Sequence, residues 1–177
     1  MHLITKLLAS LGTASAFTLG LALTQPATAD ALAPVSPPTP MPAFSIPGIS
    51  GTRGSDADLR NKVTVIRFWA SWLSSCVREM PSVQRAHDEL KKDGIQVITV
   101  SIDGTGEAAV KPVFAKGGYT MPALLDQHME VARGFGVRGV PSTVIVDRKG
   151  MINARGLGHV DFDGQVLRKH VRALARN

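Results

Sequence analysis

One run in this chain, VTVIRFWASWLSSCVREMPSV from residue 63, restricts the possible folds more than any other segment. Its first part, Val63–Ala70, is rich in β-branched and aromatic residues, which predicts a buried strand. The following residues predict a helix with Ser74 or Ser75 as N-cap and Gly94 as its stop. The run therefore predicts a strand–turn–helix junction with a cysteine, Cys76, in the first turn of the helix.

The segments around this run predict further strands and helices. Strands are expected in IQVITVSID from residue 95, MPALLD from 121, STVIVD from 142 and its hairpin partner MINARGLGHV from 151; helices are expected in GEAAVKPVFAKGG from 106, HMEVARGFGV from 128 and DFDGQVLRKHVRALAR from 161. This order predicts an α/β fold with a mixed sheet and helices on both faces. Functional groups in such sheets gather at the carboxyl ends of strands, where the segment from Trp72 to Cys76 lies.

The first residues have the three-part layout of a secretory signal peptide. A basic start with Lys6 precedes an uncharged, mostly apolar run over residues 7–23, and Ala27-Thr28-Ala29 is a small-x-small cleavage signature. We expect a signal peptide over residues 1–29, with cleavage after Ala29 or, as a second option, Ala33. The alternative is an uncleaved membrane anchor formed by residues 7–23.

Residues 30–42 are rich in proline, and we expect them to form an extended spacer that does not pack. One domain is expected over residues 43–177. Export implies an oxidising compartment, the periplasm. The single cysteine rules out a disulfide within the chain and a multi-thiolate metal site.

The overall charge gives no reason to expect a nucleic-acid partner. The chain carries 20 basic and 14 acidic residues, and its basic residues are spread out, as on a solvated outer face. Only 5% of its residues are aromatic, which argues against a base-stacking surface. No metal or cofactor is expected, because the histidines (His87, His128, His159 and His170) lack metal-ligand spacing and no glycine-rich phosphate loop follows a strand.

Two motifs resemble those of exported thioredoxin-like proteins of the TlpA/ResA type. The first is Phe68-Trp69-Ala70-Ser71-Trp72, followed by Leu73-Ser74-Ser75-Cys76 and Glu79-Met80-Pro81; the second is the loop Gly139-Val140-Pro141-Ser142-Thr143. The resemblance covers roughly residues 40–175. It implies a thioredoxin fold with a mixed central sheet, an N-terminal strand extension and a cis peptide bond before Pro141.

The resemblance also implies thiol–disulfide exchange by a C-x-x-C pair, whose first cysteine attacks and whose second resolves the mixed disulfide. Leu73 stands at the attacking position, and Cys76 is the resolving one. A single thiol can form a mixed disulfide but cannot resolve it within the molecule. We therefore predict a degenerate Leu-x-x-Cys site without dithiol turnover, which leaves both an enzymatic and a non-enzymatic role open.

The candidate catalytic residues are Cys76, Glu79 and Pro141. Cys76 is either activated by the helix N-terminus or covered by Leu73 and inert. Glu79 is either the carboxylate that relays protons to the thiol, as the resemblance implies, or an acid favoured near a helix start. Peroxide reduction is disfavoured because relatives that reduce peroxide carry a threonine where this chain has Leu73.

The candidate binding residues are Trp72, Leu73 and Val140. The resemblance implies that the loop containing Pro141 faces the cysteine and offers backbone groups to an extended peptide. Two functions remain open: residual redox chemistry at Cys76, or a non-catalytic module that binds a periplasmic peptide or partner protein, possibly one that contains a thiol. A membrane partner is expected only if the N-terminal segment is uncleaved.

Overall fold

The computed structural model describes residues 32–176, and its centre is a six-stranded sheet. The strands are β1 (Leu32–Pro40), β4 (Thr64–Trp69), β5 (Gln96–Ser101), β6 (Ala123–Leu125), β7 (Ser142–Val146) and β8 (Met151–Leu157), in the order β1-β8-β7-β4-β5-β6. Strands β4, β5 and β6 run parallel, and β7, β8 and β1 add antiparallel pairs. The expected mixed sheet is confirmed.

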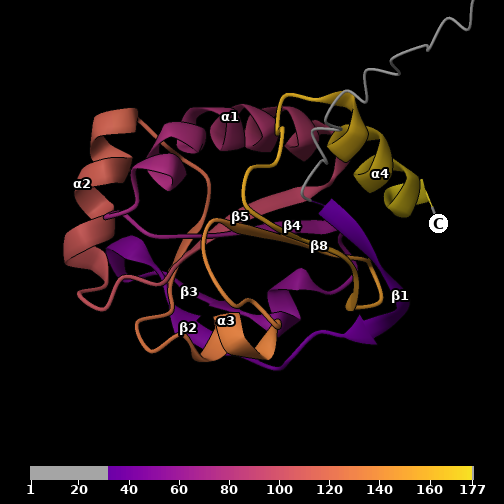
Figure 1. Cartoon of the computed structure of the whole chain (residues 1–177), viewed down its shortest axis with the longest axis horizontal. Coiled ribbons are helices and arrows are strands. Elements are labelled where there is room, and N and C mark those ends of the chain that lie inside the picture. Colours follow the sequence, from indigo (N-terminus) through magenta and orange to yellow (C-terminus); the bar gives the residue numbers. More distant parts are fainter. Residues whose placement is uncertain (1–31, 177) are drawn as a thin grey trace, which may run out of the picture.

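A second, smaller sheet and four helices surround the central one. The small sheet pairs β2 (Ser45–Pro47) with β3 (Arg53–Ser55). The helices are α1 (Ser74–Leu90), α2 (Glu107–Gly117), α3 (Glu130–Gly134) and α4 (Gln165–Arg176), and short 3-10 turns cover Ile49–Gly51, Asp56–Leu59 and Lys91–Asp93. Helices α1 and α4 lie over one face of the central sheet and α3 over the other (Figure 1).

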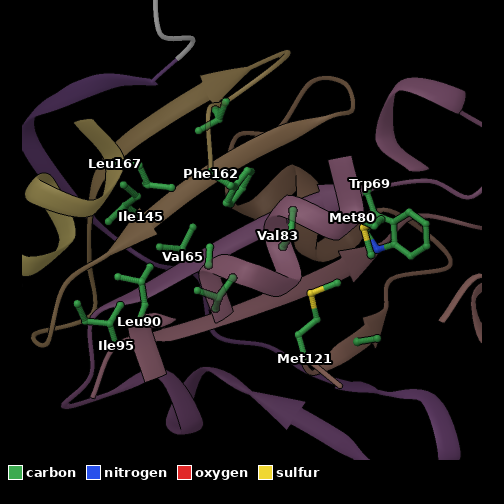
Figure 2. Close-up of a cluster of buried hydrophobic side chains, with 14 of the residues drawn as sticks. Val65, Trp69, Met80, Val83, Leu90, Ile95, Met121, Ile145, Phe162 and Leu167 are labelled. Carbon is green, nitrogen blue, oxygen red and sulfur yellow. The ribbon is translucent and has the colours of Figure 1, made fainter. Parts of the chain in front are cut away.

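Two buried clusters hold these layers together. The larger joins the sheet to α1, α2 and α4, and it contains Cys76; Figure 2 shows part of it, including Trp69, Met80 and Phe162. The other cluster joins the opposite face to α3 through Phe135 and neighbouring apolar residues. Every residue of β4 is buried, as expected for a strand with helices on both faces. The junction after β4 is therefore anchored in the core of the protein.

The expectation of an unpacked spacer over residues 30–42 is wrong for its described part. Residues Leu32–Pro40 form β1, which pairs antiparallel with β8 at the edge of the sheet. The pairing register shifts between Pro34 and Thr39, in the middle of the prolines. Proline cannot donate a ladder hydrogen bond, but an edge strand needs only one of its two sides, so prolines are tolerated there.

The expected serine cap of the junction helix is also corrected. Helix α1 has Leu73 as its N-cap residue, and no side chain caps it. The N–H of Leu73 instead donates to the carbonyl of Ala70 (3.3 Å), so the turn itself leads into the helix. The expected stop is confirmed, since a 3-10 turn extends the helix to Asp93 and Gly94 follows with φ of 71°.

The predicted signal peptide, residues 1–29, lies outside the described residues, as does the alternative anchor over residues 7–23. Within residues 32–176, no helix is both long and apolar enough to cross a membrane.

Candidate functional site

The two sequence motifs meet at the carboxyl end of β4. Strands β4 and β7 pair antiparallel with Phe68 opposite Ser142, so the residues after β4 lie beside those that precede β7. Val140 and Leu73 both pack against the buried cluster that contains Cys76. The Val140–Pro141 peptide bond is cis. The tertiary structure therefore brings together the segment from Trp72 to Cys76 and the loop around Pro141.

Cys76 is a free, buried cysteine with 1% of its surface exposed. Burial raises the pKa of its thiol, and the nearby carboxylate of Asp103 acts in the same direction. A backbone hydrogen bond from Ala70 and the charge of Arg67 lower that pKa, but burial has the larger effect. Leu73 is half-buried and packs against the same cluster. In this arrangement the thiol packs as an apolar group and the thiolate is disfavoured.

A buried carboxylate, Asp103, holds the turn between β4 and α1. It accepts hydrogen bonds from the N–H of Ser71 (2.9 Å), the hydroxyl of Ser71 (2.7 Å) and the hydroxyl of Ser101 (2.6 Å). With its oxygens occupied in this way, the carboxylate fixes the turn on the adjacent strand β5. The next residue, Trp72, has 68% of its surface exposed, so a rigid turn presents a large aromatic side chain to solvent.

Glu79 takes part in an ion pair with Arg67, which comes from the middle of β4. One carboxylate oxygen of Glu79 binds the buried guanidinium of Arg67, and the other lies 2.7 Å from Nδ1 of the exposed His159. Arg67 also donates to the hydroxyl of Thr143 (2.8 Å) and to the carbonyl of Gly158 (3.2 Å). Both oxygens of Glu79 are therefore engaged.

Arg67 is almost fully enclosed, with 1% of its surface exposed. Burial lowers the pKa of its guanidinium to about 10, so the group keeps its charge at neutral pH. The guanidinium carbon lies 5.5 Å from the centre of the Phe162 ring, which favours the cation. A buried cation needs a counter-ion, and Glu79 supplies it. The structure thus gives Glu79 a structural role as the counter-ion of Arg67.

The loop around Pro141 combines fixed and free backbone groups. The carbonyl of Pro141 accepts from the N–H of Gly158 (2.8 Å), and the hydroxyl of Ser142 donates to the carbonyl of Gly139 (2.6 Å). Val140 differs, because neither its N–H nor its C=O finds a hydrogen-bond partner in the described part of the chain. The residue as a whole is half-buried, and these two backbone groups are available to pair with an added extended segment.

Sequence reasoning missed the ion pair beneath the junction. Arg67 interrupts an otherwise apolar buried strand, and a charged residue at such a position requires a buried partner. That signal pointed to an acid but could not select Glu79. The contribution of His159 had no sequence signal, because it follows β8 and lies 80 residues beyond Glu79. Within residues 32–176, no group of three potential metal ligands comes together.

Comparisons with known proteins agree with this architecture. The AhpC/TSA family model matches residues 37–155. The thiol-disulfide oxidoreductase ResA of Geobacillus thermodenitrificans is 27% identical over 111 residues, which are 63% of this chain and 63% of that protein. The chain thus matches less than two thirds of the length of this curated relative.

Two solved structures extend the likeness. The exposed lipoprotein thioredoxin of Streptococcus pneumoniae is 26% identical with a TM-score of 0.63, covering 72% of this chain and 97% of that one. A DsbF homologue from Corynebacterium diphtheriae is 21% identical with a TM-score of 0.72, covering 85% and 97%, and this likeness concerns the fold alone. The fold is thioredoxin-like, as expected. The chain belongs to the AhpC/TSA family, and its relatives include thiol-disulfide oxidoreductases.

Proposed function

We propose that this protein has lost dithiol turnover and binds an extended segment of a partner protein. The binding surface consists of Trp72, Leu73, Val140 and Pro141 and is called the junction surface below. The observation that carries the proposal is the burial of Cys76, with 1% of its surface exposed, together with a leucine at the position where an attacking cysteine would stand. Exchange needs an accessible thiolate and a second thiol.

The junction surface has the features of a peptide-binding site. Trp72 is exposed on a turn that Asp103 holds in place. Because this turn is already fixed, binding a partner there costs little additional conformational entropy. The free backbone groups of Val140 can form ladder hydrogen bonds with an extended segment. Half-buried Leu73 adds apolar surface that packs against the same buried cluster as Val140. None of these contacts requires the thiol of Cys76.

The test is capture of partner proteins from extracts of the host by the purified chain and its variants. We expect Cys76→Ser to retain the same captured partner, and Trp72→Ser to lose it. Val166→Ser is the matched control, because Val166 is a similarly exposed apolar residue (61%) on α4. Capture that disappears with Cys76→Ser, together with a covalent adduct, would refute non-covalent binding.

A second candidate function is one-cysteine chemistry at Cys76. The observation in its favour is Arg67, whose positive charge lowers the pKa of the thiol against the effect of burial. A Cys76 thiolate would attack a partner disulfide, form one mixed disulfide and release one partner thiolate. A reducible adduct in the wild type that is absent from Cys76→Ser would support this alternative.

We also propose that the protein is exported to the periplasm and cleaved after Ala29, so that the junction surface is available to periplasmic partners. The basic start, apolar run and small-x-small signature support this proposal, and one similar structure is described as an exposed lipoprotein. N-terminal sequencing of the protein from its host tests it. A first residue of Asp30 is expected, whereas an intact start in the membrane fraction would show anchoring by residues 7–23.

A further inference from the structure

A small cavity opens beside the junction surface on the α3 side of the sheet. Its volume is about 190 Å³, and its apolar lining includes Val137, Val144 and Leu157. Ser142 also lines it and directly follows Pro141, while Leu157 is the register partner of Ser142 across β7 and β8. The cavity therefore borders the proline loop at Ser142, close to the path of a segment that pairs with Val140.

Two arginines, Arg138 and Arg155, line this cavity, and no acidic residue does so in the described part of the chain. Neither guanidinium has a carboxylate within 4.0 Å among residues 32–176. Nε of Arg155 donates to the carbonyl of Phe135 (2.8 Å), which orients the guanidinium. A second contact, from Nη2 to the hydroxyl of Thr39, is long (3.4 Å), and Nη1 makes none with the described residues.

This arrangement differs from that of Arg67 and Arg85. Arg67 is neutralised by Glu79, and Arg85 pairs with Asp163 on the surface. Arg138 and Arg155 instead present unneutralised donors above an apolar floor. A fork of guanidinium donors matches the oxygens of a carboxylate, and an apolar floor suits the methylene groups that precede it.

We propose that this cavity binds an acidic side chain, glutamate or aspartate, of the partner segment held at the junction surface. The inference rests on the proposed peptide-binding function and names the chemistry of its ligand. Arg155 is the oriented donor, and the exposed Arg138 closes over the carboxylate from the solvent side. The partner segment thus carries an acidic residue next to the residues that pair with Val140.

The test uses two pools of nonapeptides with an N-terminal fluorescein and a C-terminal amide. The pools differ only in the central residue, glutamate or glutamine, and the other positions are mixtures of uncharged residues without cysteine. Fluorescence anisotropy measures binding to the purified chain. We expect the glutamate pool to bind about tenfold more tightly than the glutamine pool. The preference should decrease in high salt, because the cavity is open to solvent.

Variants locate the preference. Arg138→Gln should reduce it to less than about threefold and leave affinity for the glutamine pool unchanged. Arg155→Lys keeps the charge but loses the fork, and it should reduce the preference as well. Arg148→Gln is the charge-matched control, because Arg148 is exposed in the turn between β7 and β8, and it should leave the preference intact. Trp72→Ser should weaken both pools equally.

The outcomes separate this inference from the function on which it rests. Equal affinity for both pools would overturn the acidic side chain and leave peptide binding at the junction surface intact. No binding of either pool would refute both. A preference that persists in Arg138→Gln and Arg155→Lys would place the acid elsewhere. A third pool, with central glutamine and a free C-terminus, should bind as weakly as the amidated glutamine pool. Tighter binding would overturn the acidic side chain and show that the cavity binds the carboxylate of a chain terminus instead.

Discussion

The substitution Glu79→Gln tests whether the ion pair below the junction stabilises the fold. It removes the counter-ion of Arg67, which has 1% of its surface exposed, and leaves a buried cation without a charged partner. Removing one member of a buried ion pair costs about 3–5 kcal/mol. Glutamine can still accept one hydrogen bond, and Thr143 and Gly158 still bind the guanidinium. We therefore expect a loss of about 3 kcal/mol in the free energy of unfolding.

Urea unfolding followed by tryptophan fluorescence measures this loss. Trp69 is a suitable probe because it is fully buried in β4, the strand that also carries Arg67. Two variants serve as controls. The double variant Arg67→Met with Glu79→Gln removes the cation as well, and its stability should return to within about 1 kcal/mol of the wild type. His159→Gln removes only the exposed partner of Glu79 and should cost less than about 1 kcal/mol.

Two results would refute this reasoning. A loss below about 1 kcal/mol in Glu79→Gln would show that Arg67 does not need its counter-ion. A double variant that is less stable than Glu79→Gln would show that Arg67 stabilises the fold through its other contacts instead.

Three further predictions concern single residues. Because burial raises the pKa of Cys76, iodoacetamide should label it slowly up to pH ~8.5 and faster only above that value; a midpoint below it would contradict the assignment. Leu73→Cys should restore reduction of a fluorescent disulfide substrate; a variant that forms the new disulfide and stays inactive would show that more than one residue has been lost. Burial lowers the pKa of His170, whose Nε2 is buried without a hydrogen-bond partner among the described residues. The unfolded chain then binds more protons below pH ~6.5, so this contribution to stability is present above that pH and is lost as pH falls through the folded pKa. His170→Leu should flatten the acid side of a stability–pH curve, and an unchanged slope would contradict this.

The sequence by itself determined most of the fold. Hydrophobic periodicity predicted every strand of the central sheet except β1, and the helices beside it, because buried strands and amphipathic helices leave local patterns. The two motifs around Cys76 and Pro141 predicted which loops would face each other, and the register of β4 and β7 places them side by side. The absence of an attacking thiol at position 73 could also be predicted from the sequence alone, because no fold can replace a missing cysteine.

The tertiary structure alone decided the contacts between distant residues. Proline content predicted an unpacked segment over residues 30–42, but a partner at the edge of the sheet turned Leu32–Pro40 into β1. The position of Arg67 in an apolar strand indicated a buried charge. Only the packing of α1 and of the loop after β8 determined that Glu79 pairs with Arg67 and that His159 contacts Glu79. The cavity with Arg138 and Arg155 likewise required β8 to lie beside the proline loop. Such contacts depend on which surfaces meet in space, and a local sequence pattern records only what each surface is made of.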